Sequence, residues 1–236
     1  MMTLAKLHAE LRACRLCLEA GYEIAPGAVF SSGPAPQVML IGQAPGVTEA
    51  EVKRPFNASS GSRLFQWLAE AGWVEAEFRA RQYMTAVTKC FPGKAANGKG
   101  DRVPSRAEQA LCRPYLEREM ALVKPRLIIP VGGLAIKLFF PSKLRLDQVV
   151  GTAVYFPPTL ITDTPVRFRL KETRRFRPDN ADLRPHLNQL DKNGRWLVPL
   201  PHPSGASLWP NKPANKQLIG RALAMLHQIR QEWQLD

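Results

Sequence analysis

Four short apolar runs divide the chain into intervals that are long enough to hold a helix. The runs cover residues 37–42, 83–89, 127–132 and 196–200. Each run is continuous rather than alternating, which is typical of strands buried on both faces of a sheet. We therefore expect these segments to form the strands of one central sheet.

Helical periodicity occupies the intervals between these runs. Leu4, Leu7 and Leu11 recur on one helical face. Ser105 and Glu108 form a capping box, which predicts the start of another helix. Further apolar helical faces lie in 62–71, 134–140 and 218–233. Strands that alternate with helices predict an α/β fold, here a three-layer α/β/α arrangement around a mostly parallel four-stranded sheet.

Two turns of unusual composition follow directly after predicted strands. One reads Gly-Gln-Ala-Pro-Gly at 42–46, and the other reads Pro-His-Pro-Ser at 201–204. Ligands of parallel α/β sheets bind beyond the carboxyl ends of the strands. Both turns are predicted at such ends, so we expect them to contribute to a ligand site there.

Composition and charge narrow the functional classes. Of the 236 residues 45% are apolar, which is enough for a packed core. The net charge of +13 favours a polyanionic partner such as nucleic acid, with a basic host proteome or a solubility effect as the alternative. No apolar run approaches the roughly 18 residues that cross a bilayer, and the start does not look like a signal peptide. We expect a monomeric cytoplasmic protein without membrane contact.

The segment 143–195 has the weakest pattern in the chain. It holds 11 Lys and Arg residues against 6 Asp and Glu residues. We interpret it as a basic insertion within a single domain that covers 1–236. The excess positive charge fits an insertion that lies against DNA, and it fits a solvated loop equally well.

The four cysteines are the first candidates for a metal centre. Cys14 and Cys17 form a CxxC pair, and Cys90 and Cys112 complete a set of four. Four thiolates can hold one tetrahedral zinc ion or one iron–sulfur cluster, and the spacing does not separate the two. Four unrelated buried thiols are the alternative.

Six short motifs together identify a family. In this order along the chain, the motifs resemble the uracil-DNA glycosylase superfamily, most closely its iron–sulfur (family 4) branch. They are Cys14-x-x-Cys17, the turn at 42–46, Arg54-Pro55-Phe56 with Ser60-Gly61, Thr88-Lys89-Cys90, the segment 112–117 that begins at Cys112, and His202-Pro203-Ser204. The resemblance leaves 143–195 largely unmatched. It implies a DNA repair enzyme that flips a base out of DNA and hydrolyses its N-glycosidic bond, releasing uracil or another deaminated base.

The resemblance also implies roles for individual residues. The four cysteines would carry a structural [4Fe–4S] cluster, with zinc as the alternative. Phe56 would stack on the flipped base, and His202 would donate a hydrogen bond to the base O2, as in an oxyanion hole. The chemistry of bond cleavage gives two further candidates: backbone N–H groups of the turn that begins at Gln43 would donate hydrogen bonds or position water, and Glu49 would orient water or stabilise the cationic sugar. The implied substrate-binding residues are Gly42, Gln43, Ala44, Phe56, Ala86 and His202.

The implied DNA contacts lie in and beside the same motifs. They are Arg54, Lys89, Ser204, Gly205, Ser207, Leu208 and Trp209. The loop at 204–209 resembles the wedge that enters the minor groove when a base is flipped. Ala206 is too small to be a wedge, so Leu208 or Trp209 takes that role, with a core position for Trp209 as the alternative.

Two residues depart from the family pattern. Ala86 stands where the iron–sulfur branch has an Asn that pairs with the uracil edge, and Gln43 stands where that branch has Glu. Loss of a polar contact weakens discrimination between bases. Three interpretations follow: a glycosylase with weak activity or altered base preference, a DNA-binding protein without catalysis on the same scaffold, or a zinc-stabilised nucleic-acid-binding module.

Overall fold

The four predicted strands lie side by side in one sheet. The computed structural model describes residues 2–98, 100–161, 173–204 and 208–236. Strands β1 (Val38–Gly42), β2 (Tyr83–Ala86), β3 (Leu127–Pro130) and β6 (Arg195–Leu197) are all parallel. Their order is β2-β1-β3-β6, so the parallel part of the prediction is confirmed.

The predicted number of strands is wrong. Two further strands, β4 (Ala153–Phe156) and β5 (Arg174–Phe176), extend the sheet to six strands beyond β6. Both pairings are antiparallel, β4 with β6 and β5 with β4. All four residues of β4 are buried, so 143–195 contributes to the core and is not simply a solvated loop.

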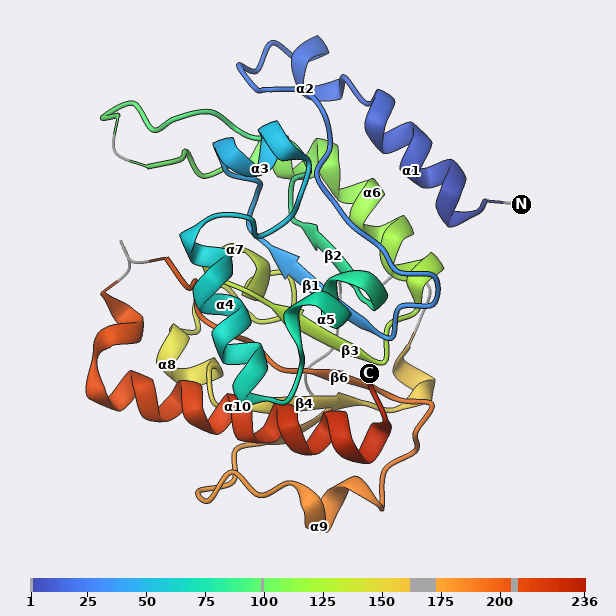
Figure 1. The fold of residues 1–236 in the computed structure, drawn as a ribbon, viewed down its shortest axis with the longest axis vertical. Coiled ribbons are helices and arrows are strands. Elements are labelled where there is room, and N and C mark those ends of the chain that lie inside the picture. Colours follow the sequence, from blue (N-terminus) through green and yellow to red (C-terminus); the bar gives the residue numbers. More distant parts are fainter. Residues whose placement is uncertain (1, 99, 162–172, 205–207) are drawn as a thin grey trace.

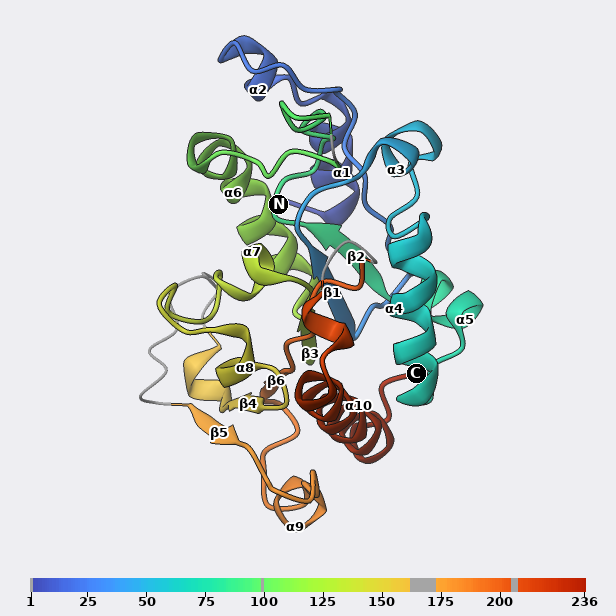
Figure 2. The same cartoon turned by 90° about the vertical axis from the view of Figure 1, so that its left-hand side faces the viewer.

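Helices cover both faces of the sheet, which confirms the three-layer arrangement. On one face lie α4 (Ser59–Glu70), α5 (Glu75–Arg81) and α10 (Pro213–Trp233). On the other lie α6 (Arg106–Val123) and α7 (Gly133–Ile136), and α1 (Leu4–Ala13) packs against the outside of α6. Figure 2 shows α6 and α7 on one side of the strands and α4 and α5 on the other.

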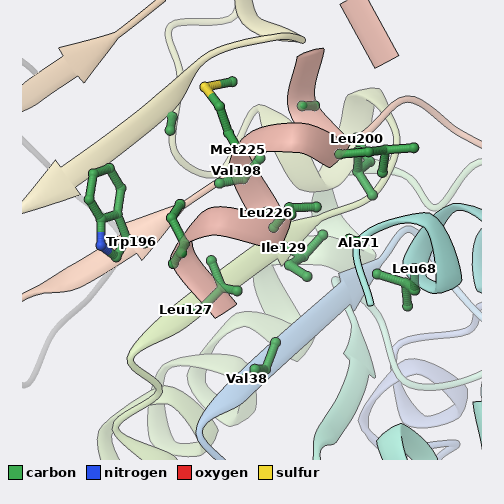
Figure 3. Close-up of a cluster of buried hydrophobic side chains, with 14 of the residues drawn as sticks. Val38, Leu68, Ala71, Leu127, Ile129, Trp196, Val198, Leu200, Met225 and Leu226 are labelled. Carbon is green, nitrogen blue, oxygen red and sulfur yellow. The ribbon is translucent and has the colours of Figure 1, made fainter. Parts of the chain in front are cut away.

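The alternation of side chains along β1 divides the core into two halves. Val38 and Leu40 pack with α4 and α10, whereas Met39 and Ile41 pack with α6 and α7. None of these four side chains is accessible to solvent. Figure 3 shows the first half, in which Val38 of β1 and Leu127 of β3 face side chains of α4 and α10. Burial on both faces explains why the sequence of β1 is continuously apolar, since each such side chain contributes ~1.5–3 kcal/mol.

The helix boundaries follow local signals in the sequence. Ser105 caps α6 as predicted: its Oγ accepts from the Glu108 amide at 3.2 Å, and Glu108 Oε2 accepts from the Ser105 amide at 2.7 Å. The predicted helix at 134–140 is shorter than expected, because α7 ends at Ile136 and continues as turns. Among the described residues, five short α-helices were not predicted: α2 (Leu16–Glu19), α3 (Val47–Val52), α5, α8 (Leu146–Val149) and α9 (Arg184–Leu187).

The carboxyl ends of the parallel strands bring the two unusual turns together. The turn at 42–46 follows β1, and the segment that reaches His202 follows β6. An isolated bridge between Val131 and Leu200 continues the pairing of β3 and β6 toward this edge. Among the described residues, no helix combines the length and apolarity needed to cross a membrane.

Candidate functional site

A cavity opens at this edge of the sheet. Every residue predicted to be catalytic or to bind substrate lines it. These residues are Gly42, Gln43, Ala44, Glu49, Phe56, Ala86 and His202. Their positions range over 160 residues of sequence, from β1 to the segment after β6, so the fold assembles one pocket from distant motifs.

The Phe56 ring lies against the end of β1. A Cβ atom on Gly42 would stand 2.9 Å from Phe56 Cζ, so only glycine lets the ring approach this closely. Phe56 has a φ of 52°, in the left-handed region that aromatic residues rarely adopt. Such a conformation costs ~1–3 kcal/mol and persists only where surrounding contacts hold it.

His202 faces the same cavity in a defined protonation state. The Ser204 amide donates to Nδ1 at 3.2 Å, so Nδ1 accepts and a neutral ring carries its proton on Nε2. Burial lowers the pKa of His202 below its ordinary value of 6.5. The ring packs on Gly132, where a Cβ atom would stand 3.2 Å from its Cδ2. The site thus holds a neutral imidazole with one N–H donor.

The turn after β1 is held by the backbone on one side and by Glu49 on the other. Gly42 and Gln43 carbonyls accept from the amides of Val87 and Thr88 at 3.0 and 3.3 Å. Glu49 Oε2 accepts from the Gly46 amide at 2.6 Å at the start of α3. Glu49 is the acidic residue among those that line the cavity, because Gln43 and Ala44 carry no charge.

Six further residues line the cavity without a role of their own in the sequence analysis. They are Val29, Pro45, Pro55, Ser60, Thr85 and Val131. Pro45 belongs to the turn at 42–46, and Pro55 and Ser60 belong to the motif around Phe56, so the motifs already pointed to their positions. Val29, Thr85 and Val131 lie outside the motifs, and only the three-dimensional arrangement assigns them to the pocket.

The residues predicted to contact DNA differ in how exposed they are to solvent. Arg54 is exposed beside the cavity, and Leu208 is 74% exposed. Trp209 packs against the core, and its carbonyl accepts from Asn215, so Leu208 is the better candidate for the wedge. Ser204 lies next to His202, while the predictions for Gly205 and Ser207 fall outside the described residues.

Lys89 is not available to DNA, which corrects its predicted role. Its side chain is 2% exposed, and Nζ lies 2.7 Å from Oε2 of Glu119 on α6. Nζ also donates to the Ala86 carbonyl at 2.5 Å, and Glu119 further accepts from the hydroxyls of Tyr83 and Thr85. A lysine that is buried in this position forms an internal ion pair and does not contact a phosphate.

The four cysteines line a second cavity. Cys14 follows α1, Cys17 lies in α2, Cys90 follows β2 and Cys112 lies in α6, and all four line this cavity. All four are free thiols. Among the residues with described positions, no three His, Cys, Asp or Glu side chains are arranged to hold a metal ion.

Burial makes thiolates unfavourable in this cavity. It raises the pKa of Cys17 to about 11, with the Cys90 and Glu108 charges adding to the effect, and it raises the pKa of Cys112 to about 12. Several thiolates would repel one another here unless a cationic centre lay between them. The donor set therefore fits an iron–sulfur or zinc centre chemically.

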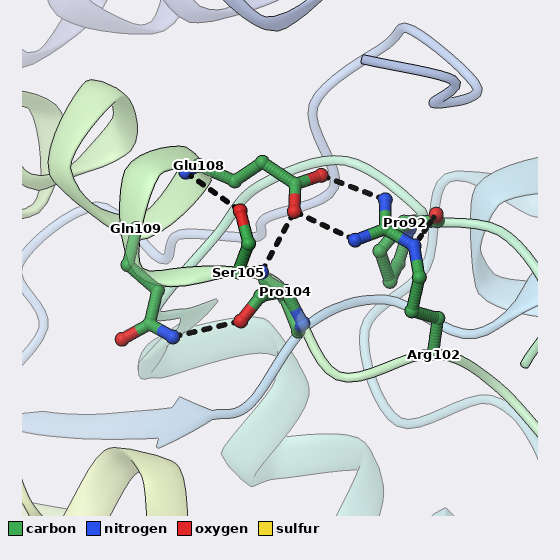
Figure 4. Close-up of polar contacts among 6 residues, drawn as sticks. All are labelled: Pro92, Arg102, Pro104, Ser105, Glu108 and Gln109. Atoms are coloured by element: carbon green, nitrogen blue, oxygen red, sulfur yellow. Dashed lines mark hydrogen bonds and ion pairs between the residues drawn. The ribbon is translucent and has the colours of Figure 1, made fainter.

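Beside this cavity, an ion pair between Arg102 and Glu108 attaches the loop before α6 to the start of the helix (Figure 4). Arg102 Nη1 and Nη2 donate to the two carboxylate oxygens of Glu108 at 2.6 and 2.7 Å, and its Nε donates to the Pro92 carbonyl. The Arg102 hydrogen bonds hold the pKa of Glu108 at about 2, well below its ordinary 4.5. Glu108 lines the cysteine cavity and caps α6, so one carboxylate joins the two features.

Comparison with known proteins places the chain in a family. The family model of the uracil DNA glycosylase superfamily matches residues 30–227. The chain belongs to the uracil DNA glycosylase superfamily. The match covers all six described strands and every cavity residue except Val29, whereas Cys14 and Cys17 precede it.

Within this superfamily the chain is similar to enzymes named Type-4 uracil-DNA glycosylase. It is 34% identical to that of Pyrobaculum aerophilum, over 64% of this chain and 71% of the relative. It is 30% identical to that of Sulfurisphaera tokodaii, over 59% of each chain. It is 28% identical to that of Thermotoga maritima, over 50% of this chain and 57% of the relative. The chain thus spans less than two thirds of the length of the second and third relatives.

Proposed function

We propose that this superfamily member is a monofunctional DNA glycosylase that hydrolyses the N-glycosidic bond of uracil in DNA. The main observation in support of the proposal is that Phe56 and His202 line the same cavity. A flipped base needs an aromatic face and a polar group aimed at its edge, and this cavity offers both.

The chemistry follows from the charges that develop as the bond breaks. When the C1′–N1 bond cleaves, the electron pair leaves with the base and positive charge remains on the sugar. Nε2–H of neutral His202 donates to the base O2, and such a donor contributes ~2.7–4 kcal/mol. Water then adds to C1′ and loses one proton, which passes through solvent to the departing base and neutralises it. Glu49 is the acidic group of the cavity that can stabilise the cationic sugar or orient this water.

Ala86 offers no hydrogen-bonding group to the base, and this absence sets the proposed base preference. Ala86 pairs in register with Gly42 across β1 and β2, and it lines the cavity with a methyl group. A methyl group cannot distinguish the uracil edge from other base edges by hydrogen bonding. We therefore include other deaminated bases, such as hypoxanthine and xanthine, among the substrates.

Cys14, Cys17, Cys90 and Cys112 would hold a [4Fe–4S] cluster. All four line one cavity, and the resemblance of the motifs to the iron–sulfur branch supports a cluster over a single zinc ion. When bound, the cluster would be a structural link among the segment after α1, the end of β2 and α6. Iron and sulfide near four each per chain, with broad visible absorption, are expected for the purified protein. One zinc per chain without colour would contradict this assignment.

The partner, assembly and location belong to the same proposal. The partner would be DNA that carries a damaged or deaminated base, and one chain supplies the whole pocket, which favours a monomer. Four cysteines of which none forms a disulfide fit a cytoplasmic location, where thiols stay reduced.

The deciding experiment uses oligonucleotides that carry uracil, hypoxanthine or xanthine at one position. We expect release of free base and an abasic site with at least the uracil substrate. His202→Ala should slow release by about 10²–10³-fold while DNA binding is retained. Binding without any base release would contradict catalysis and support the alternative, a DNA-binding protein on this scaffold.

A further inference from the structure

We propose that Arg79, which does not line the cavity, is the residue that positions Phe56 for base stacking. This inference rests on the proposed function. Arg79 lies on α5, and its contacts reach the turn that carries Phe56. It would be a positioning residue, acting on the base only through the aromatic ring.

The Arg79 guanidinium holds two successive carbonyl groups of that turn. Nη1 donates to the Pro55 carbonyl at 2.8 Å, and Nη2 donates to the Phe56 carbonyl at 2.7 Å. A planar guanidinium can span two carbonyls in a fixed orientation, whereas an ammonium group is a single point of attachment. The two peptide groups on either side of Phe56 are thereby fixed relative to α5.

Phe56 needs this support because its backbone is strained. Its φ of 52° is left-handed, and no glycine stands at this position to relieve the strain. Relaxation to negative φ would turn the side chain away from its place against Gly42. The hydrogen bonds from Arg79 act on the two carbonyls that such a rotation would move.

Arg79 is itself fixed by two neighbours. Glu75, one turn earlier on α5, accepts from Nε at 2.7 Å. The guanidinium also lies over the Phe65 ring, 4.2 Å from its centre. Its side chain is 11% exposed, which shields these contacts from water. The arrangement links α4 and α5 to the turn at 55–56 and holds the guanidinium in a single orientation.

The first test measures Phe56 directly and does not depend on catalysis. The ¹³Cα and ¹³Cβ chemical shifts of Phe56 report its backbone conformation in the full-length protein. We expect Phe56 shifts typical of a left-handed backbone conformation in the wild type, and we expect Arg79→Met to lose them. Arg81→Met, an exposed position on the same helix, is the matched control and should keep them. Left-handed values retained in Arg79→Met would overturn the inference.

The second test asks whether Arg79 acts through the ring. In single-turnover base release from a uracil oligonucleotide, Arg79→Met should be at least about tenfold slower than wild type, with Arg79→Lys between them. In a Phe56→Ala background, adding Arg79→Met should cause no further loss. An equal further loss there would indicate general destabilisation and overturn the inference. A wild type that releases no base would contradict the proposed function alone, since the chemical-shift test still decides the role of Arg79.

Discussion

At the scale of single residues, the two adjacent glycines after β3 differ in how closely other side chains pack against them. Gly132 has a φ of 86° and supports the His202 ring, whereas a Cβ atom on Gly133 would meet nothing within 4 Å. We predict that Gly132→Ala displaces the imidazole and slows base release at least tenfold, because small misplacements of a catalytic group are costly. Gly133→Ala is the matched control and should behave like the wild type. Equal rates for the two variants would refute this role for Gly132.

The protonation state of His202 gives a second prediction. Burial lowers the pKa of His202, so its proton is lost below the ordinary value of 6.5 as pH rises. We expect the ring to be neutral at pH 7 and to titrate below pH 6.5 in an NMR experiment. Comparison with His202→Gln assigns the signal among the four histidines. A titration midpoint above 6.5 would mean that the imidazole is charged near neutrality.

Ala86 carries the prediction on base specificity. Ala86→Asn would place an amide where the cavity now has a methyl group, so it should raise the preference for uracil over cytosine at least about tenfold. Ala86→Leu has a similar size without hydrogen-bonding groups and is the control. Comparing kcat/KM for the two bases gives the answer. If leucine improved selectivity as much as asparagine, shape and not hydrogen bonding would set the preference.

At the scale of elements, the contact between Arg102 and the start of α6 depends on pH. The pKa of Glu108 is about 2 in the fold against an ordinary 4.5. The unfolded chain therefore binds the proton first as pH falls, and the stabilisation present above pH 4.5 is lost between about 4.5 and 2. We predict that Arg102→Met flattens the fall in unfolding free energy over this range.

The control for this effect lies on the same helix. Arg113 and Glu117 of α6 form an exposed pair at 3.0 Å, and exposed pairs contribute little. Arg113→Met should leave the pH dependence of stability unchanged, as measured by denaturant unfolding at several pH values. A similar flattening in both variants would show that the buried position of Glu108 has no special role.

The elements that the sequence predicts are those whose own residues show a clear hydrophobic pattern. β1 and β3 are apolar throughout, so their pattern shows directly that both faces are buried. β5 reads Arg-Arg-Phe with its arginines exposed, and only its pairing with β4 makes it a strand. No local pattern predicts it.

Side-chain roles follow the same rule. The motifs of Phe56 and His202 predicted that the two residues share one cavity, whereas no motif predicted the burial of Lys89. Its partner Glu119 lies 30 residues further along the chain and approaches only when α6 packs on the sheet. Arg79 has no motif at all, because its role consists of contacts with main-chain carbonyls.

At the scale of the whole molecule, the charge of +13 predicts a strong salt dependence of DNA binding. Each phosphate contact releases counterions, so log K should fall linearly with log salt. Arg54→Gln should reduce the magnitude of that slope by about 1. Arg184→Gln is the control, since α9 lies at the end of the molecule away from α3 (Figures 1 and 2). Equal slopes for both variants would exclude Arg54 from the DNA contact.

The extension of the sheet by β4 and β5 also affects how copies of the chain meet. β5 stands last in the order of the described strands, and an outer edge that no described strand covers offers hydrogen bonds to another extended chain. Arg174 and Arg175 are exposed along it. Two such edges brought together would set like charges against each other, so the arginines oppose strand pairing between copies of the chain at this edge.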